Sequence, residues 1–401
     1  LFPEWYMQCS KKVEYTHAPA WYKGIEYMKE QERGFSYKED QLVPGWFELP
    51  MKKGESVIFS AGISEVNTKT LKTLWNKELE RRGTREDMFT CLKIAAQQFY
   101  KREGDKCYLL AGYPWFMDWG RDTMIALQGL TLCTGRFQDA REILESFSKY
   151  VKDGMIPNVF PNSAKDEPMY NTIDASLWYF YAAYKYANYT QDYEFIEQEI
   201  YPVLKNIINA YYKGTGFNIH MDSDGLIIAG SDLDQITWMD VRVGDFVVTP
   251  RHGKPVEINA LWYNARLFTA AVQRQLGKEQ IADLMEYQAE ITKDTFVKTF
   301  WNCMYLDDYV DGDYHNKEVR PNQIIAASLP FSPLDKKQRK AVVDICTKEL
   351  YTPKGLRTIS PKSGGYRPEY IGGQLERDRN FHNGPVWPWT IAAYAIAYRK
   401  V

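Results

Sequence analysis

Histidine is scarce in this chain, and the spacing of the five that occur does not suit a metal site. They form no HxxxH or HExxH pair, so a zinc centre is not predicted. The six cysteines are dispersed and form no CxxC pair, so we expect reduced thiols in a cytoplasmic protein. The sequence therefore predicts neither a metal nor another cofactor. The histidines are His17, His220, His252, His315 and His382.

Long apolar runs and an excess of charge are also missing. No stretch reaches the roughly 18 uncharged apolar residues of a membrane helix, and no signal peptide is visible. The 50 basic and 52 acidic residues leave a net charge of −2 without a long run of either sign. This balance argues against nucleic acid or an anionic membrane as a partner. Walker-type glycine loops and GxSxG elbows are absent as well, which excludes the chemistry that those motifs support.

Aromatic residues, in contrast, are abundant. The chain has 12 tryptophans, 29 tyrosines and 19 phenylalanines. Flat apolar rings with polar edges suit ligands that are both apolar and hydroxylated, and sugars are the commonest such ligand. Tyrosine-rich helix packing explains the same composition, so composition alone does not decide between the two interpretations.

The first part of the chain differs in pattern from the rest. Residues 33–62 contain short β-type runs, GWFEL and SVIFSAG, separated by a proline and a Lys-Lys-Gly turn. They predict that residues 1–64 are the end of an N-terminal β-domain. The charged residues 65–85 predict a linker helix, after which residues 86–401 form a helical domain.

Two kinds of helix alternate in this helical domain. One kind is amphipathic, with apolar residues spaced by three and four. It occupies residues 136–152, 193–212, 279–301 and 335–350. The other kind is apolar nearly all round and must be buried on most sides; it occupies residues 123–133, 174–187, 258–272, 323–330 and 386–398. The alternation predicts a mainly α fold with an inner barrel of helices inside an outer layer.

A polar cluster precedes each apolar helix. The clearest is GYPWFMDWGRDTMIAL, residues 112–127. If the inner helices run parallel, all five clusters meet at one end of the barrel and form a pocket, into which the helix N-termini point their free N–H groups. Helix capping explains a single member such as Asp174 equally well. The residues expected to line the pocket and bind substrate are Trp115, Asp118, Trp119, Arg121, Asp122, Asp174, Trp238, Arg251, Glu257, Asn322, His382 and Trp387.

Carboxylates beside tryptophans favour the hydrolysis of a glycosidic bond. That reaction needs a protonated carboxyl for the leaving oxygen and an ionised carboxylate that activates water or attacks the sugar. Asp240 is the best acid candidate because its setting in TWMD, between Trp238 and the next loop, desolvates the carboxyl. A turn-capping role for Asp240 is the alternative.

Several motifs carry a family resemblance. GYPWFMDWGRDTMIAL, TWMD, VTPRHGKPVEINALWYNA, RPNQIIAASLP and FHNGPVWPW resemble, in the same order, the glucosidase half of glycogen debranching enzymes, the amylo-α-1,6-glucosidase family. The resemblance covers residues 86–401, and residues 33–62 resemble the end of the β-domain that precedes the barrel in bacterial and archaeal members. It implies an (α/α)6 barrel and an inverting hydrolase that removes α-1,6-linked glucose from a branched α-glucan such as glycogen or limit dextrin.

The resemblance also implies roles for individual residues. Asp240 corresponds to the general acid, and Arg121 and Asp122 correspond to the pair that holds the non-reducing glucose. Eukaryotic members carry a glutamate where this chain has Val386, which cannot accept a proton. We therefore predict Glu376 as the general base and Asp378 as the second candidate, while Glu257 is expected to bind substrate or to serve as a further candidate.

Two other functions are compatible with these motifs. One is a trehalase-like or glucoamylase-like inverting glucosidase of the same barrel type, since one barrel hosts several sugar specificities. The other is a non-catalytic glycan-binding module, which the valine at position 386 keeps open.

Overall fold

The computed structural model describes residues 3–104, 106–112, 116–160 and 167–401. The chain divides into two compact units, Leu1–Gln98 and Phe99–Val401. The first unit consists of strand pairs and helices, and the second is mainly helical with small antiparallel sheets.

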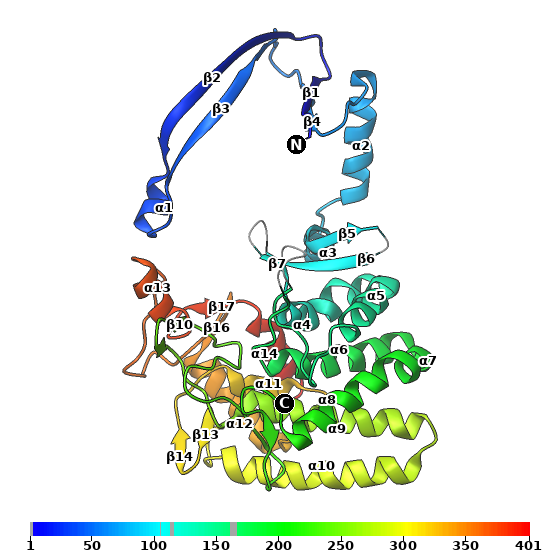
Figure 1. Ribbon diagram of the computed structural model, residues 1–401, viewed down its shortest axis with the longest axis vertical. Coiled ribbons are helices and arrows are strands. Elements are labelled where there is room, and N and C mark those ends of the chain that lie inside the picture. The colour runs from blue at the N-terminus through cyan, green and yellow to red at the C-terminus, as the bar shows by residue number, and fades with distance from the viewer. Residues whose placement is uncertain (1–2, 105, 113–115, 161–166) are drawn as a thin grey trace. The chain divides into compact units, whose positions relative to one another are not determined.

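The first unit is built on two antiparallel strand pairs. Strand β1 (Tyr6–Cys9) pairs with β4 (Phe59–Gly62). Strand β2 (Glu14–Glu26) pairs with β3 (Lys38–Glu48) as a long curved ribbon that the short helix α1 (Met28–Glu32) connects (Figure 1). Helices α2 (Leu71–Arg82) and α3 (Met88–Ala96) follow, with a 3₁₀ turn, η1 (Thr68–Thr70), before α2 and another, η2 (Gln97–Phe99), after α3.

The second unit contains the expected alternation of helices. The helices predicted to be apolar are α4 (Gly120–Leu130), α6 (Asp174–Thr190), α9 (Val256–Gln275), α11 (Asn322–Ser328) and α14 (Thr390–Arg399). The amphipathic ones are α5 (Phe137–Ser148), α7 (Tyr193–Phe195) continued by the π-helical turn η4 (Ile196–Ile200) and α8 (Tyr201–Lys213), α10 (Glu279–Phe300) and α12 (Lys336–Glu349). The remaining helical segments are η3 (Leu132–Thr134) and α13 (Gln374–Asn380).

Short antiparallel strands connect these helices. The three-stranded sheets are β5 (Tyr100–Glu103), β6 (Lys106–Gly112) and β7 (Phe116–Asp118); β12 (Lys254–Pro255), β13 (Tyr309–Asp311) and β14 (Tyr314–Asn316); and β15 (Tyr351–Thr352), β16 (Gly355–Arg357) and β17 (Val386–Trp387). The two-stranded sheets are β8 (His220–Met221) with β9 (Ile227–Ile228) and β10 (Arg242–Val243) with β11 (Phe246–Val247).

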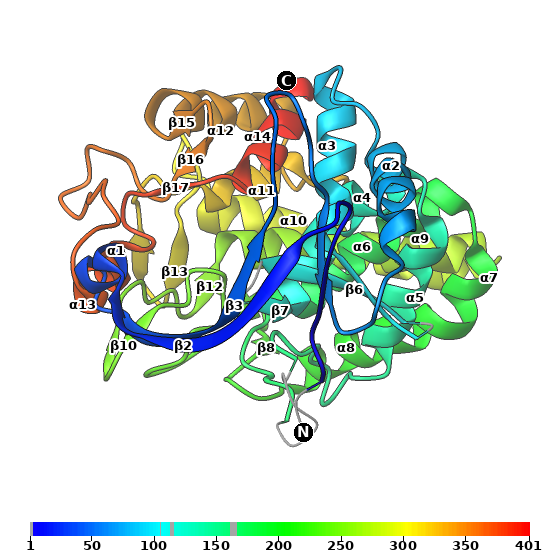
Figure 2. The same ribbon diagram turned by 90° about the horizontal axis from the view of Figure 1, so that it is seen from above.

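The apolar helices pack on one another in chain order. Helix α4 contacts α6, α6 contacts α9, α9 contacts α11, and α11 contacts α14. The amphipathic helices lie against them: α5 on α6, α10 on α9, and α12 on α11 and α14. Figure 1 shows α10 running alongside α9, and Figure 2 shows α12 beside α14. The apolar helices therefore form a connected row beneath the amphipathic ones.

The hydrophobic core follows this row, with one exception to the expectation. Every residue of α11 is buried, and nearly every residue of α9 is buried too. Helix α14 was expected to be buried on most sides, but only Thr390, Tyr394 and Ala397 are. The reason is that α11 and α12 cover one side of α14, while its remaining apolar side chains stay partly accessible.

Candidate active site

The site begins where helix α4 starts. Gly120 opens this helix in close contact with another loop: its N–H donates to the carbonyl of Asn158 at 2.8 Å. A Cβ at Gly120 would lie 2.1 Å from the carbonyl oxygen of Pro157, so no larger residue fits without a backbone shift. This close approach fixes the next two residues, Arg121 and Asp122, at the mouth of the helix.

Arg121 connects three parts of the chain. Its Nε donates to Asp174 Oδ2 at 2.7 Å, and its Nη1 donates to Asp240 Oδ2 at 3.1 Å. Its Nη2 donates to the carbonyl of Thr237 at 3.3 Å. Arg121 and Asp174 are buried, whereas the Asp240 side chain keeps 26% of its surface exposed. The guanidinium thus joins the starts of α4 and α6 to the TWMD segment and leaves one carboxyl accessible.

Burial controls the protonation of the accessible carboxyls. It raises the pKa of Asp240, although the charge of Arg121 acts in the opposite direction. Burial likewise raises the pKa of Asp122, again against the influence of Arg121. A carboxyl whose pKa is raised remains protonated at higher pH, as a proton donor must.

A second buried network extends from the same segment. Arg251 forms a bidentate ion pair with Glu257, and its Nε donates to Asp308 Oδ2 at 2.7 Å. Asn322 donates to Asp308 Oδ1 at 2.7 Å and accepts from the indole nitrogen of Trp238 at 2.6 Å. The starts of α9 and α11 are thereby tied to TWMD.

An aromatic cluster brings in the last predicted polar group. The Trp238 ring packs edge-on against His382, Trp387 and Trp389, with ring centroids 5.0 to 5.5 Å apart. His382 is fully buried, and neither ring nitrogen has a hydrogen-bond partner in the part of the chain that the structure describes. Burial, and then the charge of Arg320, lowers the pKa of His382 well below its usual range, so the ring is neutral.

A cavity of about 550 Å³ opens beside these groups. Its charged groups are Arg121, Asp122 and Asp240, and much of the remaining wall is apolar. The lining residues include Leu109, Leu110, Phe116, Trp119, Ile125, Ala126, Leu130, Trp238, Phe381, Trp387 and Trp389. We refer to it as the Asp240 cavity. This cavity therefore combines groups that suit a sugar ligand. Carboxyl groups can cleave a glycosidic bond, and indole rings offer apolar faces to a sugar ring.

The structure brings together most of the predicted site residues. Six of them line the Asp240 cavity: Trp119, Arg121, Asp122, Trp238, Asp240 and Trp387. Five more belong to the buried networks and the aromatic cluster around it: Asp174, Arg251, Glu257, Asn322 and His382.

The two remaining predicted binding residues, Asp118 and Trp115, precede α4. Asp118 accepts from the Thr123 hydroxyl at 3.0 Å, and burial raises the pKa of its carboxyl to about 7. Trp115 lies outside the described residues.

The structure does not bring the two predicted base candidates to the Asp240 cavity. Glu376 and Asp378 lie on α13, and neither lines this cavity. Glu376 is exposed, and its Oε2 accepts from the N–H of Gly373 at 2.9 Å, a capping bond at the start of its own helix. Glu257 is fully occupied by Arg251.

Sequence reasoning missed two residues that hold the site together. Asp308 accepts from Arg251 and Asn322, and Thr237 accepts from Arg121 at its carbonyl and from Arg251 at its hydroxyl. Asp308 stands before a short hairpin rather than before a helix, so the search for polar clusters at helix starts passes over it. Thr237 directly precedes Trp238, and its neutral side chain gives no chemical signal.

The described part of the chain lacks two further features. No group of three histidine, cysteine, aspartate or glutamate side chains is arranged to hold a metal ion there. Nor does any helix in these ranges combine the length and the apolar character needed to cross a bilayer.

A mainly helical domain whose cavity combines carboxyls, an arginine and indole rings is typical of the glycoside hydrolase class. The comparisons with known proteins identify its family. The family model described as amylo-alpha-1,6-glucosidase matches residues 94–401, and the model described as glycogen debranching enzyme N terminal matches residues 2–58. The chain belongs to the amylo-alpha-1,6-glucosidase family.

A curated relative agrees with this assignment. The glycogen debranching enzyme of Saccharomyces cerevisiae is 27% identical to the chain over 371 residues. The match covers 70% of this chain and 24% of the yeast protein, so the chain spans about a quarter of that relative's length.

Proposed function

We propose that the second unit is an inverting glucosidase that releases glucose from α-1,6 branch points of a branched α-glucan such as glycogen or limit dextrin. The observation that carries the proposal is the Asp240 carboxyl, which lines the cavity, is hydrogen-bonded by Arg121 and shares the cavity with several tryptophan rings. In this proposal the helices belong to an (α/α)6 barrel, and the chain's partner is the glucan alone, with neither nucleic acid nor membrane. A cytoplasmic location stays a prediction.

Asp240 acts as the general acid in this proposal. Burial raises the pKa of this carboxyl and so favours the protonated form that a proton donor needs, and the remaining exposure of the side chain gives the glycosidic oxygen access. Arg121 and Asp122 bind the hydroxyls of the terminal glucose, since a guanidinium and a carboxylate can each form two hydrogen bonds to adjacent hydroxyls. The tryptophan rings provide apolar faces against which the sugar stacks.

The base assignment stays a prediction, with Glu376 first and Asp378 second. For Glu376 to activate water, its carboxylate must leave the cap at Gly373 and approach the cavity. In the reacting complex an inverting pair should be about 6.5 to 9.5 Å apart. Glu376→Gln should then abolish the hydrolysis of every substrate equally. Near-normal activity of this variant would show that Glu376 is not the general base, and Asp378 would become the first candidate.

Replacing Asp240 tests the acid assignment. Asp240→Asn should lower hydrolysis of a branched limit dextrin by roughly 10²- to 10⁴-fold, because a positioned proton donor is lost. α-Glucosyl fluoride should be partly spared, since fluoride leaves with little protonation. The matched control is Asp245→Asn, an exposed aspartate outside the lining of the Asp240 cavity, which should leave both rates near normal.

The products distinguish the proposal from its alternatives. Release of β-glucose from limit dextrin supports an inverting debranching activity. A preference for trehalose or linear maltose would instead indicate the trehalase-like or glucoamylase-like enzyme. Binding of glycogen without any turnover would indicate a glycan-binding module.

A further inference from the structure

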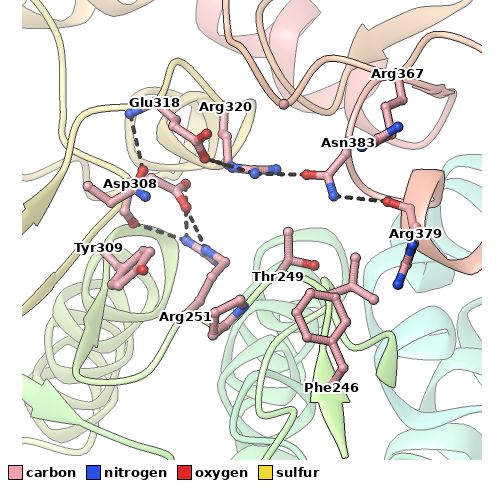
Figure 3. A pocket seen from close by; sticks show the side chains of 14 residues that line it. Phe246, Thr249, Arg251, Asp308, Tyr309, Glu318, Arg320, Arg367, Arg379 and Asn383 are labelled. Atoms are coloured by element: carbon pink, nitrogen blue, oxygen red, sulfur yellow. Dashed lines mark hydrogen bonds and ion pairs between the residues drawn. The ribbon is translucent and has the colours of Figure 1, made fainter. Parts of the chain in front are cut away.

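A second cavity of about 450 Å³ is lined by Arg251 and Asp308 of the second buried network. The two cavities share no lining residue. They are connected through Thr237, which accepts hydrogen bonds from Arg121 of the Asp240 cavity and from Arg251 of the second cavity. Figure 3 shows the second cavity, with Arg320 and Asn383 on one side and Arg251, Thr249 and Phe246 on the other.

The floor of this cavity is rigid and charged. Arg251, Asp308 and Arg320 are all buried. Arg320 donates to the carbonyl of His382 at 2.8 Å and to Asn383 Oδ1 at 3.0 Å, and it pairs with Glu318 at 2.9 Å. These groups are already positioned by their protein partners, so a ligand would meet a preorganised surface.

Three polar groups lining the cavity lack a partner within the described ranges. The hydroxyl of Thr249 is buried and makes no hydrogen bond there. The guanidinium groups of Arg367 and Arg379 are exposed at the rim and form no ion pair or side-chain hydrogen bond with any described residue. A buried hydroxyl without a partner costs free energy that a bound ligand would recover.

Asn383 holds both rim arginines in place through their backbones. Its carbonyl accepts from the N–H of Arg367 at 2.6 Å, and its side-chain amide donates to the carbonyl of Arg379 at 3.0 Å. The same side chain accepts from Arg320. One asparagine therefore links the buried floor to two free guanidinium groups on the rim (Figure 3).

The charges of the cavity are unbalanced. Four guanidinium groups line it, those of Arg251, Arg320, Arg367 and Arg379, against two lining carboxylates, those of Asp308 and Glu318. A third carboxylate, that of Glu257, pairs with Arg251 from outside the lining. The surplus is on the rim, because the carboxylates pair with the two buried arginines. Planar guanidinium groups bind phosphate oxygens with two parallel hydrogen bonds.

The remaining wall suits a sugar ring. Phe246 and Tyr309 supply aromatic faces, while Thr249 and Asn316 supply neutral hydrogen-bonding groups. We propose that this second cavity binds a hexose that carries a phosphate monoester, with the ring against the aromatic side chains and the phosphate on Arg367 and Arg379. The proposal does not depend on the hydrolytic role of Asp240.

Calorimetry on the full chain tests the proposal with defined probes. Glucose 6-phosphate should bind at least roughly tenfold more tightly than glucose, and inorganic phosphate should compete with it. A maltooligosaccharide with a 6-phosphate distinguishes the sources: preference for it indicates a phosphorylated glucan, and preference for glucose 6-phosphate indicates a free sugar phosphate. Equal binding of glucose and glucose 6-phosphate, or no binding of either phosphate ester, would overturn the proposal.

Variants locate the binding in this cavity. The double variant Arg367→Gln, Arg379→Gln should weaken glucose 6-phosphate binding by roughly tenfold to a hundredfold. The control Arg242→Gln, an exposed arginine outside the cavity lining, should leave binding unchanged. Thr249→Val should weaken glucose 6-phosphate and glucose alike, because the lost hydroxyl faces the ring. Unchanged binding in the double variant would overturn the assignment, and retained binding in Asp240→Asn would separate it from the proposed hydrolysis.

Discussion

At the residue scale, Arg121 has two opposing effects on the proposed acid. It holds the Asp240 carboxyl in place, yet its positive charge favours the ionised form that cannot donate a proton. Asp174 shares the same guanidinium and takes up part of that charge. Two opposing effects therefore act on the pKa of Asp240: burial raises it, and the charge of Arg121 lowers it.

The pH dependence of the reaction should reveal this balance. An acid must be protonated, so kcat/KM should fall as pH rises through the pKa of Asp240. Arg121→Gln removes the charge that lowers this pKa, so the alkaline limb of the pH profile should move to higher pH. Arg121→Lys keeps the charge and should leave the limb nearer its original position, whatever it does to the rate. A limb that moves to lower pH in Arg121→Gln would contradict the assignment.

His382 should make stability depend on pH. Its pKa in the folded protein lies well below that of an unfolded chain, about 6.5, so the unfolded state binds the extra proton first. Its contribution to stability is therefore complete above about pH 6.5 and declines by up to about 1.4 kcal/mol per pH unit as pH falls below it. Urea unfolding at several pH values measures this decline. In His382→Phe, the free energy of unfolding should fall less steeply with decreasing pH, by the same amount per pH unit. An unchanged pH dependence of the free energy of unfolding would contradict the interpretation.

At the element scale, α4 depends on a glycine at its start. Gly120→Ala should lower the free energy of unfolding by about 1 to 3 kcal/mol, because the added Cβ would displace the backbone at Pro157. The control is Gly129→Ala on the same helix, where a Cβ meets no atom within 4 Å. That change should stabilise the protein by about 0.5 to 1 kcal/mol through helix propensity. Thermal unfolding distinguishes them, and equal effects would contradict the role of Gly120.

The helices could be predicted from the sequence because their apolar spacing is set by local geometry. Residues 258–272 predict a buried helix, and α9 is one. Strand β2 was not predicted, since register shifts between His17 and Ala20 and between Tyr22 and Ile25 interrupt the alternation that identifies a strand. The incomplete burial of α14 depends on neighbours that are distant in the sequence, so its own residues give no sign of it.

The candidate site could be predicted only in part, for a similar reason. Asp240 and Arg121 stand in recognisable local motifs, and the structure joins them. Asp308 acquires its importance only from two partners on other elements, which local spacing does not reveal. The residue type of Glu376 and its position in the chain predict a general base, but its carboxylate accepts a hydrogen bond from the nearby Gly373 N–H.

At the scale of the whole molecule, the two units differ greatly in burial. The main hydrophobic cluster lies entirely within Phe99–Val401, whereas the buried apolar residues among residues 3–98 are Cys9, Leu71, Ile94 and Ala96. The amides of β2 and β3 should therefore exchange hydrogen much faster than those of α9, because local stability follows apolar burial. Hydrogen exchange measured by mass spectrometry checks this, and equal protection would contradict it.

Thr237 is hydrogen-bonded by one arginine from each cavity. Its carbonyl is held by an arginine that lines one cavity, and its hydroxyl is held by an arginine that lines the other. A ligand that shifted either arginine would therefore alter a hydrogen bond of this one residue. Thermodynamic linkage then requires reciprocity. If a ligand in one cavity changes the affinity of the other cavity for its ligand by some factor, the second ligand changes the affinity for the first by the same factor. If both proposals hold, a sugar phosphate bound in the second cavity should change the rate of glucan cleavage through the hydrogen bonds of this single threonine.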